Sequence, residues 1–117
     1  MRYMLLLYGD EKLRKPLPPK EMEAMYGAYF AYKQALVASG AFVESGPLQP
    51  SATATTVRGD RDPIEVLDGP FAETKEQLAG FFLIDVANLD AALDWAKRCP
   101  AVQGGLVEVR PVMQIPT

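Results

Sequence analysis

Two segments of this 117-residue chain are apolar on both sides of an extended backbone, and they constrain the fold most strongly. Residues 2–8 alternate between two apolar sets, which are Tyr3, Leu5 and Leu7 on one side and Met4, Leu6 and Tyr8 on the other. Residues 80–86 alternate in nearly the same way. Strands of this kind lie in the middle of a sheet and are covered on both faces. The sequence therefore predicts a sheet with these two segments as its central strands.

Two helices are predicted between the strands. The first spans residues 19–39, begins at Pro19 and ends before Gly40, a residue suited to the left-handed position after a helix. Its apolar stripe consists of Met22, Met25, Tyr29, Tyr32 and Leu36, widened by Tyr26, Phe30 and Val37. Gly27 lies inside this helix, where a close approach of another helix is one explanation. The second helix follows the N-cap residue Asn88 and ends before Pro100.

The remaining extended segments complete an α+β pattern. Strands are expected at 41–44, followed by a break at 45–47, and at 106–112. Residues 53–58 and 63–67 are expected to form a β-hairpin around a turn at 59–62. Without the hairpin, the order is the βαββαβ pattern of ferredoxin-like folds. We expect residues 1–117 to form one domain, because two would each be too short to bury a core.

The helices leave one face of the predicted sheet without a cover. Two helices can cover only one side of a four-stranded sheet. The other side would expose apolar side chains from both central strands, a patch too apolar for the surface of a monomer. We therefore expect a homodimer in which the two sheets pack against each other.

The composition excludes several kinds of chemistry. The chain has no His and one Cys, which excludes a His-dependent catalytic triad, a His-ligated metal site and an intrachain disulfide. A net charge of −3 without a basic cluster argues against nucleic-acid binding. No segment approaches the roughly 20 apolar residues of a membrane span. We expect a cytoplasmic protein that uses no cofactor and no metal and does not bind a membrane.

The most distinctive motif is Asp68-Gly69-Pro70-Phe71, followed by Glu73-Thr74-Lys75-Glu76. Together with residues 3–9, 48–50, 53–58 and 107–111, in this order, it resembles the DGPF proteins of the YCII-related family. The resemblance implies a ferredoxin-like dimeric α/β barrel. Some members are proposed to use a His/Asp pair, and only the acidic half is carried over here, to Asp68. Relatives are often encoded beside alternative sigma factors, which suggests a regulatory partner.

Asp68 is the candidate catalytic residue, a carboxylate at a cleft mouth that acts as an acid or base. The alternative is a turn in which the Asp68 side chain accepts a hydrogen bond from a nearby backbone N–H. Tyr8, Glu73, Lys75 and Arg110 are the candidate substrate-binding residues. Glu73 and Lys75 would share the cleft with Asp68, or else form a solvated surface turn. Arg110 would hold a carboxylate or phosphate, or else blunt an edge strand.

The residues suggest one function, and the resemblance together with the missing histidine suggests another. The first is a cofactor-independent enzyme that acts on a small molecule by proton transfer, isomerisation or elimination. The second is a non-enzymatic ligand-binding or regulatory protein associated with an alternative sigma factor. A third possibility is that the hairpin and its 59–62 turn only extend the dimer interface. Phe71 and Cys99 are interpreted as buried apolar residues rather than as catalytic groups.

Overall fold

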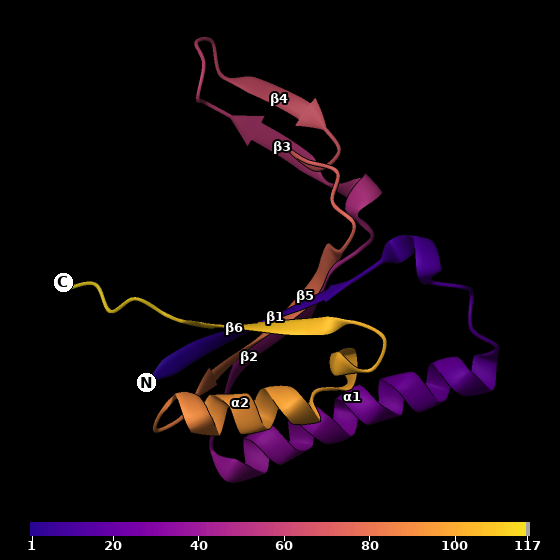
Figure 1. Ribbon diagram of the computed structural model, residues 1–117, viewed down its shortest axis with the longest axis vertical. Helices are drawn as coiled ribbons and strands as arrows, with labels where there is room; N and C mark the ends of the chain where they lie inside the picture. Colours follow the sequence, from indigo (N-terminus) through magenta and orange to yellow (C-terminus); the bar gives the residue numbers. More distant parts are fainter. Residues whose placement is uncertain (117) are drawn as a thin grey trace.

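The computed structural model describes residues 1–116, which form two helices, a four-stranded antiparallel sheet and a separate two-stranded hairpin (Figure 1). The sheet has the order β2-β5-β1-β6 and contains β1 (Arg2–Gly9), β2 (Phe42–Pro47), β5 (Gln77–Asp85) and β6 (Leu106–Pro111). The hairpin consists of β3 (Thr55–Arg58) and β4 (Glu65–Asp68). The helices are α1 (Pro19–Ser39) and α2 (Leu89–Arg98), and the short 3₁₀ turns are η1 (Glu11–Leu13), η2 (Ser51–Thr53) and η3 (Pro100–Val102). The α+β class and the central positions of β1 and β5 are confirmed.

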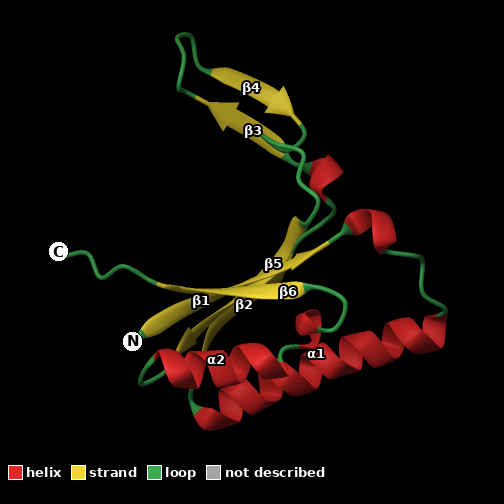
Figure 2. Ribbon diagram, in the orientation of Figure 1, coloured by secondary structure: helices red, strands yellow, loops and turns green. Residues whose placement is uncertain are grey.

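Both helices lie on the same side of the sheet (Figure 2). The core between them contains Leu5 of β1, Ile84 of β5 and Leu36 of α1, which are all fully buried. Burial of each of these side chains stabilises the fold by about 1.5–3 kcal/mol. Val107 and Val109 of β6 also pack against this core, as their alternation with Glu108 and Arg110 predicts.

Tyr32 connects α1 to both the sheet and α2. Its ring packs edge-on against Phe82, with the ring centroids 5.0 Å apart, and against Trp95 at 6.0 Å. Its hydroxyl donates a hydrogen bond of 2.7 Å to the Trp95 carbonyl oxygen. This bond satisfies the polar end of an otherwise buried aromatic side chain. The same burial raises the pKa of the Tyr32 phenol.

The helix ends follow the sequence closely. The Asn88 side chain accepts a hydrogen bond of 2.9 Å from the Ala91 N–H and caps α2. Gly40 ends α1 with a φ of 80°, in the left-handed region that glycine adopts without steric cost. Both predicted ends are confirmed.

The predicted apolar stripe of α1 is only partly buried. Tyr32 and Leu36 are in the core. Tyr26, Phe30 and Val37 are 63%, 66% and 49% exposed, so the prediction that they widen the buried stripe is wrong. The helix has 21 residues and is about 30 Å long. Its N-terminal half, which includes Tyr26, extends past the end of the sheet (Figure 1). Phe30 lies two positions before Tyr32, which puts it on the opposite side of the helix from the core.

Two predictions that depended on glycine are also wrong. Residues 45–47 do not interrupt a strand but belong to β2, because Gly46 lets the strand pass close to the Phe81 ring on β5. A Cβ atom on Gly46 would lie 3.1 Å from that ring. Pro47 is tolerated because β2 is an edge strand. Gly27 does not mark a helix contact, since a Cβ atom there would meet nothing within 4 Å.

The predicted hairpin is confirmed, although its connection is longer and runs over residues 59–64. It stands on the side of the sheet opposite to the helices (Figure 2). Phe71 follows the hairpin and is 87% exposed. The prediction that Phe71 is buried is therefore wrong, because the segment after β4 lies away from the helix-covered core.

Gly105 is expected to tolerate no side chain. A Cβ atom there would lie 2.5 Å from the Tyr8 carbonyl oxygen and 2.8 Å from that of Ala101, both backbone atoms. We expect Gly105→Ala to lower the free energy of unfolding by about 1–3 kcal/mol in urea denaturation. The matched control is Gly27→Ala, which removes a helix-interior glycine in open space and should raise stability by about 0.5–1 kcal/mol. Equal effects of the two substitutions would contradict the close approach at Gly105.

Candidate functional site

The face of the sheet away from the helices is the first component of the candidate site. We call it the open sheet face, and it carries Met4, Leu6 and Tyr8 of β1 with Phe81 and Leu83 of β5. Met4 lies opposite Leu83, and Leu6 lies opposite Phe81. All five side chains are only half-buried. The structure thus contains a continuous apolar strip over its two central strands, as the alternation in the sequence predicts.

Charged residues of β6 border this strip. Glu108 lies opposite Leu6 and Arg110 lies opposite Met4, so both side chains share the open sheet face. An Arg110 nitrogen donates a hydrogen bond of 2.9 Å to a Glu108 carboxylate oxygen. Arg110 remains 68% exposed, so its guanidinium can also meet an anion from outside the chain.

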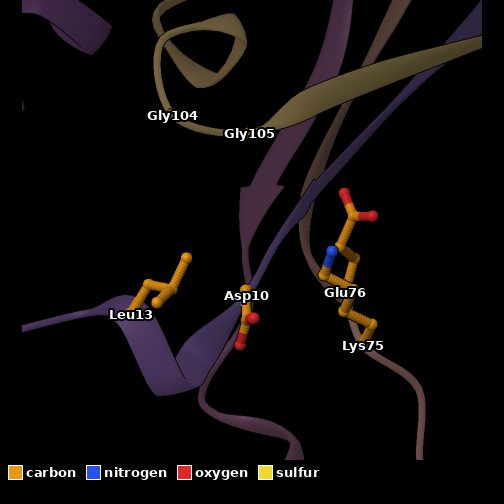
Figure 3. Close-up of a pocket in the computed structure, with 6 residues that line it drawn as sticks. All are labelled: Asp10, Leu13, Lys75, Glu76, Gly104 and Gly105. Atoms are coloured by element: carbon orange, nitrogen blue, oxygen red, sulfur yellow. The ribbon is translucent and has the colours of Figure 1, made fainter.

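A surface depression of about 270 Å³ lies at the C-terminal end of β1. Its lining residues come from three parts of the chain and are Asp10, Leu13, Lys75, Glu76, Gly104 and Gly105. Figure 3 shows Leu13 on one side and Lys75 with Glu76 on the other, with Asp10 between them. The depression therefore combines one ammonium group with two carboxylates. Such a mixture can hold a polar ligand by charge and hydrogen bonds.

Glu11 organises the backbone next to the depression. Its carboxylate accepts hydrogen bonds from the Ser51 N–H at 2.8 Å and from the Ser51 hydroxyl at 2.5 Å. The Glu11 N–H donates to the Gln77 side-chain oxygen at 2.9 Å, and the Gln77 amide donates to the Thr74 carbonyl at 2.5 Å. The hydrogen bonds from Ser51, the hydroxyl first, lower the pKa of Glu11. This network holds η1, η2 and the segment before β5 in fixed positions.

The structure places the five predicted site residues in three separate regions. Tyr8 is on the open sheet face two residues before Asp10, and Lys75 lines the depression, so both lie at the same end of the sheet. Arg110 lies four positions along β6 from the residue paired with Tyr8, about 13 Å away. Asp68 is the last residue of β4, and Glu73 lies in the segment that follows; both are exposed and neither lines the depression.

Sequence reasoning missed Asp10, Glu11 and Glu76. Asp10 and Glu11 belong to residues 9–18, whose charges and prolines are typical of a surface loop, and Glu76 belongs to a run typical of a charged surface turn. The partners of Glu11 are 40 and 66 residues away along the chain. No local pattern in the sequence indicates contacts over such separations.

Cys99 is buried, as predicted, and burial raises the pKa of its thiol. A thiol with a raised pKa is a poor nucleophile. Within residues 1–116 no cluster of three or more Cys, Asp or Glu side chains is placed to bind a metal ion. None of the helices in the described part of the chain has the length and apolar character needed to cross a membrane.

Comparison with known proteins identifies the family. The YCII-related domain matches residues 1–116, which is nearly the whole chain. The chain belongs to the YCII-related family. A family relative from Rhizobium meliloti (strain 1021), itself an uncharacterised protein, is 40% identical over 114 residues, covering 96% of this chain and 92% of the relative.

A solved structure shares the fold of this YCII-related chain. It is the 5-chloro-2-hydroxyhydroquinone dehydrochlorinase TftG from Burkholderia phenoliruptrix AC1100, in complex with 2,5-dihydroxybenzoquinone. The similarity has a TM-score of 0.51 and covers 97% of this chain and 94% of that one. At 16% identity, it is a likeness of fold.

The Glu11 network is expected to make stability depend on pH. Because the pKa of Glu11 is lowered in the folded chain, its contribution is present above the unfolded pKa. That contribution is lost as the pH falls through the folded pKa, below the ordinary glutamate range. We expect Glu11→Gln to lower the free energy of unfolding at pH 7 by about 1 kcal/mol. The difference from the unmodified chain should shrink on acidification.

Urea denaturation at several pH values measures this effect. Glu65→Gln is the control, because it removes the same charge from an exposed position on the hairpin. A loss at pH 7 that is equal for the two variants, or independent of pH, would contradict the role of Glu11.

Proposed function

We propose that this chain is a cofactor-independent enzyme that acts on a small molecule by proton transfer, as an isomerase or a lyase. The observation that carries this proposal is the depression at the C-terminal end of β1, which Lys75, Asp10 and Glu76 line and which lies at the same end of the sheet as Tyr8. An apolar platform with a few convergent polar groups is the usual form of a small-molecule site. Carboxylates, a phenol and cationic side chains suffice for proton transfer next to a carbonyl.

The proposed ligand is a flat ring with oxygen substituents. The half-buried aromatic and aliphatic side chains of the open sheet face suit the apolar faces of such a ring. Lys75 and Arg110 suit its anionic oxygens. The dehydrochlorinase that shares this fold is bound to 2,5-dihydroxybenzoquinone, a molecule of this kind, which supports the choice of class.

Each predicted site residue has a role in this proposal. Asp68 is the acid or base, although it does not line the depression of its own protomer. Tyr8 donates a hydrogen bond to a ligand oxygen. Lys75 neutralises an oxyanion, with Glu73 beside it. Arg110 binds a carboxylate or a second oxygen at the far end of the open sheet face.

The proposal includes an assembly, which is a homodimer with a ferredoxin-like protomer and the form of an α/β barrel. The strand order β2-β5-β1-β6 with both helices on one face supports the ferredoxin-like topology. The half-buried apolar strip supports packing of one open sheet face against another, because a monomer rarely leaves such a strip in water.

Ligand binding and proton exchange test the enzymatic proposal. We expect 2,5-dihydroxybenzoquinone, or an aromatic acid, lactone or keto acid from a small panel, to raise the melting temperature by several degrees at saturation. In D₂O, NMR should detect deuterium entering the ligand. Asp68→Asn should slow this exchange by about 100-fold or more, and Lys75→Ala should weaken binding. Lys20→Ala, an exposed change on α1, is the control.

Two results would contradict the enzymatic proposal. One is that no compound of the panel stabilises the unmodified chain. The other is that Asp68→Asn exchanges deuterium as fast as the unmodified chain does.

A second candidate function is a regulatory one, in which the chain binds a partner protein such as an alternative sigma factor. The exposed aromatic side chains of Tyr26 and Phe30 favour it, because they lie on α1, away from the open sheet face. Aromatic side chains are enriched where proteins bind each other. Affinity measurements with a purified sigma factor test it. Phe30→Ala should weaken that binding about 10-fold or more, whereas Ala38→Ser, an exposed change on α1, should not.

A further inference from the structure

The protomer exposes far more surface than a compact chain of its size. Its accessible surface is 8724 Å², whereas a folded monomer of 12.8 kDa exposes about 6300 Å². Its radius of gyration is 16.3 Å, against about 13 Å for a compact domain of this length. The excess of roughly 2400 Å² is larger than the 800 Å² that each partner buries in an ordinary protein interface. This excess is more than enough surface for each chain to bury in a stable dimer.

The β3–β4 hairpin is exposed and lies apart from the main sheet. It is a two-stranded unit outside the main sheet, and an isolated hairpin of this size is marginally stable in water. Val57 on β3 lies opposite Val66 on β4, and both are about two-thirds exposed. Ile64, two residues before Val66, is 70% exposed. One side of the hairpin is therefore apolar and without a cover in the protomer.

Asp68 is on this same side of the hairpin. Side chains of a strand alternate between its two faces, so Val66 and Asp68 share one face, and Glu65 and Leu67 share the other. Asp68 lies opposite Thr55, which is two residues before Val57. Any molecule that packs on the apolar side of the hairpin therefore also lies against the Asp68 carboxylate.

The position of the hairpin indicates what that molecule is. The hairpin stands on the side of the sheet opposite to the helices (Figure 2), which is also the side of the open sheet face. A copy packed on the open sheet face, with about 10 Å between the sheets, would occupy the space on that side. One two-fold operation would then give a partner to the open sheet face and to the hairpin together.

We infer that the apolar side of the β3–β4 hairpin clasps a second copy of this chain, so that the partner covers Asp68 and completes the catalytic site around it. This inference rests on the proposed function for the role of Asp68 and extends it. In a single protomer, Asp68 is exposed and remote from the lined depression. The clasp explains how an exposed carboxylate becomes sheltered, because the partner subunit excludes water from the hairpin face that carries it.

Variants of two adjacent hairpin residues test the clasp through the mass of the assembly. Val66→Lys places a charge on the apolar side, and Leu67→Lys makes the same kind of change on the opposite side. Circular dichroism first confirms that both variants are folded. Light scattering over a dilution series should then show at least a 10-fold weaker dimer for Val66→Lys than for Leu67→Lys. A dimer equally stable in both variants, or a monomeric unmodified chain, would overturn the inference.

Carbodiimide labelling of carboxylates tests the cover over Asp68 without any ligand. Asp68 should be labelled at least 5-fold more slowly in the unmodified dimer than in the monomeric Val66→Lys variant. Glu65 serves as the internal control, because it lies on the opposite side of the hairpin and should react equally in both. Equal labelling of Asp68 in dimer and monomer would overturn the inference. Ligand binding is not needed for either readout, so a failed ligand screen and a failed clasp are distinct results.

Discussion

The architecture depends on a mismatch between the central strands and the elements that cover them. β1 and β5 are apolar on both faces of the sheet, but α1 and α2 cover only one of the two faces. The covered face forms a dense core around Leu5, Ile84 and Leu36. The other face keeps its apolar side chains half in water. A hydrophobic surface of this size costs free energy until something covers it. The proposed assembly and the proposed site both follow from this single imbalance.

The sequence was sufficient where local chemistry decides the structure. The alternation in residues 2–8 and 80–86 predicted the central strands, and Asn88 and Gly40 marked helix ends. The Thr- and Val-rich run 53–58, the turn after it and the run 63–67 predicted the hairpin. It failed where tertiary geometry decides. The helical spacing of Tyr26 and Phe30 says nothing about where the sheet ends, and Gly46 resembles a turn residue until the Phe81 ring across the strand pair is known.

The same limit applies to the candidate site. Asp68 and Lys75 were chosen as candidates because they lie in one distinctive motif. That motif does not show that Asp68 ends a hairpin strand, outside the depression that Lys75 lines. The groups that fix the depression come from distant parts of the chain. Glu11 binds Ser51 and Gln77 through contacts that span 40 and 66 residues. Such pairings depend on the complete topology, because no short segment brings them together.

The hairpin also matters for chains that have just been synthesised. Its two strands contain four residues each and lie apart from the main sheet. Few contacts therefore stabilise the pairing of these strands before the proposed assembly. Arg58 ends β3 and Arg61 lies in the following connection, and both are cleavage points for trypsin-like proteases. In the proposed dimer, a chain without its partner would therefore present two such peptide bonds in the segment that the partner covers. Cellular proteolysis would then remove orphan subunits and spare completed ones.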